Sequence, residues 1–226
     1  MNGDKTLIEG EHKVKKLSII KEVVASLLSS IKKETFIIYG LFFMVSLVLI
    51  FIYDKLSLHQ IMNQYHNSFF DIFFKYITHV GDGVMFGVLV IAFFFIKRKM
   101  VLVFLVSGIL TLLVTHLFKK IIFKGIPRPV GALGEEALHL IEGVKMALMN
   151  SFPSGHTTTA FAIFTILCLY HSKNKLQYAW IFLAILAGFS RVYLSQHFLI
   201  DILVGSFLGI IIGFISMSLF YSSLKK

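Results

Sequence analysis

An arginine, a histidine and an aspartate occur within twelve residues of a chain that otherwise contains few charged residues. They are Arg191, His197 and Asp201, in the stretch from Ser190 to Asp201. His197 and Asp201 are four residues apart, so on a helix their side chains would lie one above the other. The carboxylate could then hold the imidazole in one tautomer and leave its other nitrogen free. This pattern predicts a nucleophilic histidine; the alternative is a structural His–Asp hydrogen bond.

A second group of reactive residues begins an apolar segment at Pro153-Ser154-Gly155-His156. Pro153 ends a loop, Ser154 is of the type that caps helices, and Gly155 permits close approach of the backbone. The N-terminus of a helix binds phosphate through free N–H groups and a favourable dipole. His156 at this position could donate a proton to a departing oxygen.

A third stretch supplies positive charge at the end of another apolar segment. It contains Lys119-Lys120, followed by Pro127-Arg128-Pro129. Arginine provides paired N–H donors for phosphate oxygens, and lysine adds a point charge. Arg128 and Arg191 therefore suit a phosphate group undergoing in-line displacement, in which charge on the oxygens must be neutralised.

Together the three stretches, from about Lys119 to Asp201, resemble the signature of the type 2 phosphatidic acid phosphatase superfamily. The Ser-Arg, His and Asp of its third part and the Pro-Ser-Gly-His of its second part are matched without a gap. The first part departs, because the family usually has six residues between its lysine and Arg-Pro, whereas seven separate Lys120 from Arg128. We assign Lys120 by this spacing. Lys119 is the alternative, because it continues a polar stripe at steps of four, Ser107, Thr111 and Thr115.

The resemblance implies a mechanism and a set of roles. His197 would attack phosphorus to form a phosphohistidine, Asp201 would orient it, and His156 would act as general acid. The phosphoryl oxygens would be bound by Lys120, Arg128, Ser154, Gly155 and Arg191. No cofactor and no metal ion are implied.

The resemblance also implies a class of substrates, namely phosphate monoesters or pyrophosphates of membrane lipids. Those it permits are undecaprenyl pyrophosphate, phosphatidylglycerophosphate, phosphatidic acid and lipid A phosphate. Two alternatives stay open. One is a phosphotransferase that passes the phosphoryl group to another lipid, and the other is a non-catalytic protein that binds or transports lipid phosphates.

The composition is that of an integral membrane protein. Of 226 residues, 57% are hydrophobic and only 15% are charged, and the mean hydropathy is +0.82. Continuous apolar runs without period-two alternation predict helices that cross about 30 Å of hydrocarbon. We expect an all-α bundle of six transmembrane helices over residues 36–226. The six segments are roughly Phe36 to Tyr53, Val80 to Ile96, Met100 to Phe118, His156 to Tyr170, Tyr178 to Leu194 and Phe198 to Tyr221.

The chain has a net charge of +10, but most of its basic residues lie outside the apolar segments, which argues against nucleic acid as a partner. Their distribution instead predicts the orientation of the protein in the membrane. With both termini cytoplasmic, six spans place fourteen of the 22 lysine and arginine residues inside. The three motifs then meet on the extracytoplasmic face of a plasma (inner) membrane. The expected partners are the bilayer and a lipid phosphate; the sequence does not indicate an oligomeric state.

The segments outside the six spans also give expectations. Residues 1–35 are expected to form a cytoplasmic segment with an amphipathic helix on the membrane surface, its apolar positions being Leu17, Ile20, Val24, Leu27, Leu28 and Ile31. Asp82 is interpreted as the N-terminal cap of the second span, with a catalytic acid as the alternative. Residues 130–150 carry Ala137, Ile141, Val144 and Leu148 at helical spacing, which predicts an amphipathic helix lying flat beside the site, where it could shape substrate entry; a plain connector is the alternative.

Overall fold

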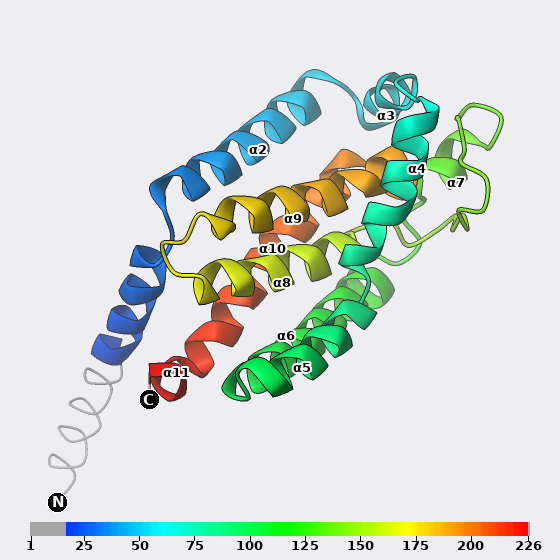
Figure 1. Ribbon diagram of the computed structural model, residues 1–226. Helices are drawn as coiled ribbons and strands as arrows, with labels where there is room; N and C mark the ends of the chain where they lie inside the picture. The colour runs from blue at the N-terminus through cyan, green and yellow to red at the C-terminus, as the bar shows by residue number, and fades with distance from the viewer. Residues whose placement is uncertain (1–16, 226) are drawn as a thin grey trace, which may run out of the picture.

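The fold is all-helical, as expected, in a computed structural model that describes residues 17–225 (Figure 1). Within that range no strand forms, and one isolated bridge joins Pro127 to Met149. The elements are α2 (Lys33–Ile52), α3 (Lys55–Asn63), α4 (Ser68–Ile77), the 3₁₀ turn η1 (Thr78–Gly81), α5 (Val84–Ile96), α6 (Lys99–Leu117), the π turn η2 (Phe118–Ile122), α7 (Pro129–Leu133), α8 (Gly155–Tyr170), α9 (Leu176–Tyr193), α10 (Leu199–Leu219) and α11 (Tyr221–Lys225).

Each of the six apolar segments forms a helix, and four of these helices are long and apolar enough to cross a membrane. They are α2, α6 with its π turn, α9 and α10. The segment from Ser68 to Gly81 together with α5 gives a fifth candidate, bent by 63°. At 16 residues, α8 is shorter than a span normally requires. The structure therefore contains four or five candidate spans, and a sixth stays a prediction.

Helix α8 occupies the centre of the bundle. All its residues from Thr157 to Leu169 are buried, and it packs most extensively against α10 and α9. The close approach of α8 to α10 requires glycine at position 209, because a Cβ there would lie 2.5 Å from the carbonyl oxygen of Thr158. Small residues bring membrane helices together in this way. The packing places the N-termini of α8 and α10, which carry two of the motifs, side by side.

The N-terminal amphipathic pattern corresponds to a helix over residues 17–29. Leu27 and Ile31 are buried in the core, whereas Leu17 and Ile20 are about half exposed. The segment is tied to the bundle where the backbone N–H of Lys173 donates to the carbonyl of Ser30 at 2.8 Å. Its position at a membrane surface stays a prediction.

The amphipathic helix predicted within residues 130–150 is wrong, because none of its apolar positions from Ala137 to Leu148 is helical. Helix α7 ends at Leu133, and residues 134–150, which we call the site loop, form no helix. Gly134 and Gly143 have φ values of 83° and 75°, a conformation that interrupts a right-handed helix. Ile141 and Val144 nevertheless pack against the cluster of Phe74, Tyr193 and Leu194. The site loop therefore covers the same end of the bundle as α3 and α4 (Figure 1).

Candidate active site

His197 and Asp201 meet at the N-terminus of α10. His197 precedes the helix, and Asp201 lies in its first turn, where its carboxylate accepts a hydrogen bond from the backbone N–H of Phe198 at 3.0 Å. Nδ1 of His197 lies 3.2 Å from Oδ2 of Asp201, and both side chains are almost completely buried. The contact expected from their spacing is present, but it is made across a helix start rather than along a helix face. Nε2 is the nitrogen left to face a substrate.

Ser151 is a third member of this group that the sequence analysis did not identify. Its hydroxyl donates to Oδ2 of Asp201 and lies 3.4 Å from Nδ1 of His197. The backbone N–H of Ser151 is fixed in turn by the carbonyl of Ile126 at 3.0 Å. Oδ2 of Asp201 thus contacts three groups, the Ser151 hydroxyl, the Phe198 N–H and Nδ1 of His197, which together hold the carboxylate towards the imidazole.

The Ser154 and Gly155 positions form the N-terminus of α8. Ser154 is the N-cap, and its hydroxyl accepts hydrogen bonds from the backbone and side chain of Thr157. Its backbone N–H donates to the carbonyl of Asp201 at 3.0 Å, so this N-terminus is joined to that of α10. A Cβ at Gly155 would lie 3.8 Å from Nζ of Lys119. The free N–H end of α8 and a lysine ammonium therefore face the same small region.

The structure brings Lys119, and not Lys120, to the other predicted site residues. Lys120 is exposed, whereas Lys119 is half-buried. Lys119 continues the inward-facing stripe of Ser107, Thr111 and Thr115, as the alternative assignment expected. The π turn Phe118–Ile122 follows at this point and changes the helical spacing of the residues between the lysines and Arg128.

Arg128 and Arg191 converge on Gln196, which the sequence analysis also missed. Oε1 of Gln196 accepts from Nη2 of Arg191 at 3.3 Å and lies 3.4 Å from Nη1 of Arg128. Nη1 of Arg191 also donates to the hydroxyl of Thr78 at 2.7 Å. Nε of Arg191 is buried without a hydrogen-bond partner among the described residues. An unsatisfied guanidinium donor at this position suits an anionic ligand oxygen.

His156 is held by Asp82, and the interpretation of Asp82 as a helix cap is wrong. Helix α5 has Gly83 as its N-cap and no side-chain cap among the described residues. The two oxygens of Asp82 instead contact two histidines, with Oδ2 at 2.7 Å from Nδ1 of His79 and Oδ1 at 2.5 Å from Nε2 of His156. Asp82 therefore pairs with His156 much as Asp201 pairs with His197.

Two cavities meet at His156. The first has a volume of about 290 Å³ and is lined largely by polar side chains, including Asp82, Lys145, His156, Arg191 and Gln196. The second, of about 470 Å³, is a largely apolar groove between α5, α6 and α8. Its lining residues include Gly83, Phe86, Gly87, Phe104, Gly108 and Leu112. The arrangement could receive a polar head group in one cavity and an apolar chain in the other.

The electrostatic environment favours a neutral His197. Burial, reinforced by the positive charges of Lys119, Arg128 and Arg191, holds the pKa of His197 well below its usual range. A neutral imidazole has the lone pair that a nucleophile requires. Burial also lowers the pKa of Arg128, and the Asp201 carboxylate opposes this shift.

The residues that carry this geometry lie within a region matched by a model of the PAP2 superfamily, which covers residues 99–225. The chain belongs to this superfamily. The match confirms the resemblance drawn from the three motifs, all of which fall inside it. Asp82 and His79 lie before the matched region.

Two proteins from Bacillus subtilis are similar in sequence to parts of the chain. An undecaprenyl-diphosphatase BcrC from Bacillus subtilis is 32% identical over 155 residues, which cover 67% of this chain and 75% of that protein. A phosphatidylglycerophosphatase B from Bacillus subtilis is 35% identical over 75 residues, covering 29% of this chain and 36% of that protein.

Solved structures show the same fold. The crystal structure of Aquifex aeolicus LpxE superimposes with a TM-score of 0.62 at 30% identity, covering 72% of this chain and 94% of LpxE. A transmembrane PAP2-type phosphatidylglycerolphosphate phosphatase from Bacillus subtilis gives a TM-score of 0.56 at 20% identity, covering 93% of this chain and 96% of the other. The second comparison supports the arrangement of nearly the whole chain.

Proposed function

We propose that the protein is a membrane lipid phosphatase that hydrolyses a phosphate monoester or pyrophosphate of a lipid through a phosphohistidine. The observation that carries this proposal is the meeting, at His156, of a polar pocket that contains Arg191 and an apolar groove. A soluble phosphate ester would need only the pocket. A lipid phosphate would use both, with its phosphate beside the arginine and its chain between α5 and α6.

The first chemical step would use the free nitrogen of His197. Nε2 attacks phosphorus, and the bond between phosphorus and the leaving oxygen breaks as the new N–P bond forms. Arg128, Arg191 and the N–H groups at the start of α8 would stabilise the equatorial oxygens, where charge is concentrated in the transition state. We assign the lysine of this group to Lys119, because its ammonium faces Gly155.

Proton transfer would be the task of His156. With Nε2–H of an imidazolium His156 donating to Asp82, Nδ1 can give its proton to the leaving oxygen, and the ring becomes neutral. In the second step Nδ1 accepts a proton from water while the water oxygen attacks the phosphohistidine. The N–P bond to His197 breaks and inorganic phosphate leaves, for a monoester and for the terminal phosphate of a pyrophosphate alike, and both histidines return to their starting states. No metal ion takes part in this scheme.

We propose that the protein crosses the plasma membrane six times with both termini in the cytoplasm. The active site would then lie on the extracytoplasmic face. The ends of α6 and α9 and the starts of α8 and α10 carry the motifs, so all of them lie on one face if the bundle crosses the membrane. The excess of basic residues on the opposite side supports this orientation.

The function is tested by incubating the purified full-length protein in detergent with a panel of lipid phosphates. Undecaprenyl pyrophosphate is the first to test, because the undecaprenyl-diphosphatase aligns with two thirds of the chain. Release of inorganic phosphate in the presence of EDTA supports a metal-independent phosphatase. Transfer of label to an added lipid alcohol would indicate a phosphotransferase. Binding without turnover of any lipid phosphate would indicate the non-catalytic alternative.

A further inference from the structure

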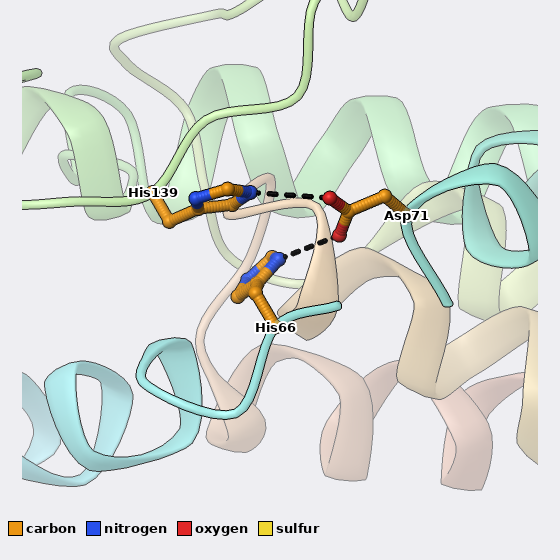
Figure 2. Close-up of side chains that lie close together, drawn as sticks. All are labelled: His66, Asp71 and His139. Atoms are coloured by element: carbon orange, nitrogen blue, oxygen red, sulfur yellow. Dashed lines mark hydrogen bonds and ion pairs between the residues drawn. The ribbon is translucent and has the colours of Figure 1, made fainter. Parts of the chain in front are cut away.

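A cluster of two histidines and one aspartate lies outside the proposed catalytic group, at the end of the bundle covered by the site loop. His66 follows α3, Asp71 is in α4, and His139 is in the site loop. Figure 2 shows the two imidazole rings approaching the same carboxylate from different segments of the chain. The proposed reaction uses none of these three residues.

The side-chain atoms of the three residues are close enough together to coordinate one metal ion. Nδ1 of His66 lies 2.9 Å from Oδ1 of Asp71, and Nε2 of His139 lies 3.2 Å from Oδ2. The three potential ligand atoms all lie within 4.8 Å of one another. Tetrahedral zinc with bonds of about 2.0–2.1 Å needs ligand atoms roughly 3.3 Å apart, so small side-chain rotations would complete the arrangement.

Neighbouring residues hold the ligands in place. The hydroxyl of Tyr193 donates to Oδ1 of Asp71 at 2.7 Å, and the ring of Tyr193 packs against that of His66 with centroids 4.1 Å apart. Oδ1 of Asn63 accepts from the backbone N–H of His139 at 2.7 Å. Partners of this kind orient metal ligands and tune their basicity.

The three side chains differ in their exposure to solvent, which increases from His66 through Asp71 to His139. His66 is 6% exposed, Asp71 is 20% exposed, and His139 is 51% exposed. A metal ion could therefore reach the cluster from solvent past His139. Three protein ligands would leave a fourth position for water.

We propose that His66, Asp71 and His139 bind a divalent transition metal ion of the class that prefers imidazole, with Zn²⁺ as the leading member. The ion joins three segments that are separate in sequence, namely the connection between α3 and α4, α4 itself and the site loop. Because Tyr193 lies two residues after Arg191 in α9, the ion also fixes these segments against the helix that carries a phosphate-binding arginine.

Metal binding has one local cost. Coordination through Nδ1 of His66 leaves the ring proton on Nε2, which lies 3.3 Å from the amide nitrogen of Asn63. The amide must turn to present its oxygen, and it then loses the hydrogen bond from the backbone of His139. The three metal–ligand bonds must outweigh this loss.

The test is calorimetric titration of the chelator-stripped, full-length protein in detergent with ZnCl₂, compared with the variants His139→Gln, Asp71→Asn and His116→Gln. His116 is an exposed histidine at the end of α6 and serves as the matched control. We expect one equivalent of Zn²⁺ to bind the wild type and His116→Gln alike. His139→Gln and Asp71→Asn should weaken binding by more than about 100-fold, beyond the loss typical of a residue that only supports a ligand.

Two further measurements keep the result independent of catalysis. Co²⁺ bound at the site should give the visible absorption of a tetrahedral complex in the wild type and not in His139→Gln. Excess Zn²⁺ should raise the melting temperature of the wild type and leave that of His139→Gln unchanged, because only a folded-state site is stabilised by its ligand. His139→Gln is on an exposed loop and should remain monodisperse. The proposal is overturned if the wild type binds no stoichiometric Zn²⁺, or if His139→Gln binds it as tightly.

Discussion

Nε2 of His156 lies 2.5 Å from Oδ1 of Asp82, although the two residues belong to separate parts of the chain. Nε2–H of His156 donates to the carboxylate, which fixes the orientation of the ring and leaves Nδ1, protonated in the imidazolium form, to face the leaving oxygen. Asp82 is therefore proposed as a positioning residue, which acts on the reaction through His156.

Replacing Asp82 by Asn should impair the general acid selectively. Turnover of lipid phosphates, whose alkoxide leaving groups need a proton, should fall by a substantial part of the about 10²–10⁴ that a general acid contributes. Turnover of an activated aryl phosphate should change little. The control is His79→Gln, which removes the other partner of Asp82 but alters an exposed side chain. Equal losses on both substrates would mean that Asp82 does not act through His156.

The choice between the two lysines is tested by single alanine substitutions. Lys119→Ala should lower kcat by about 10²–10³, the range for loss of one donor to transition-state charge. Lys120→Ala should leave kcat near that of the wild type, because its side chain is exposed. Steady-state kinetics on matched amounts of folded protein decide the matter. A larger defect for Lys120→Ala would restore the assignment made from family spacing.

The two lysines show where sequence reasoning reached its limit. The motif spacing favoured Lys120, whereas the polar stripe of Ser107, Thr111 and Thr115 favoured Lys119, the less exposed of the two in the structure. Spacing along the chain alone could not choose between these two indications, because the connection to Arg128 begins with a π turn. The contact between His197 and Asp201 was predictable because it is local, and the six apolar helices were predictable from continuous hydrophobicity.

The contacts that sequence reasoning missed are long-range. Ser151 meets Asp201 because the N-termini of α8 and α10 are packed together. Gln196 follows Arg191 by five residues but meets Arg128, which lies 68 residues before it in the chain. The site loop has helical spacing of apolar residues, yet its glycines and tertiary contacts prevent a helix. In each case packing between distant segments decided the outcome.

His59 should make the folded state sensitive to acid. Burial lowers its pKa to about 4 from an ordinary value of 6.5, so below pH 6.5 the unfolded chain binds a proton that the folded protein does not. The free energy of unfolding should fall by up to about 1.4 kcal/mol per pH unit from 6.5 down to the folded-state pKa, or about 3 kcal/mol in all. This loss is complete only at or below pH 4, and it is absent above pH 6.5.

The measurement is the melting temperature of chelator-treated protein between pH 7.5 and 4, for the wild type and His59→Gln. The variant should lose less stability over this range, since glutamine does not titrate. Parallel curves for the two proteins would contradict a lowered pKa at His59.

The orientation in the membrane is tested by labelling single cysteines in intact cells. In a Cys168→Ala background, Lys124→Cys lies in an exposed segment near the motifs, and Lys175→Cys lies at the exposed start of α9 at the opposite end. An impermeant maleimide should label position 124 directly and position 175 only after the membrane is permeabilised. The reverse pattern would place the site on the cytoplasmic side.

The central claim is that His197 forms a covalent bond to phosphorus while His156 supplies a proton. The most direct measurement is rapid acid-free quenching of the reaction with a ³²P-labelled activated aryl phosphate, followed by mapping of the label. His156→Ala should accumulate acid-labile label on His197, because attack proceeds with a good leaving group while activation of water is slowed. His197→Ala should take up no label and should be inactive on every substrate. Label on another residue, or full turnover by His197→Ala, would contradict the account.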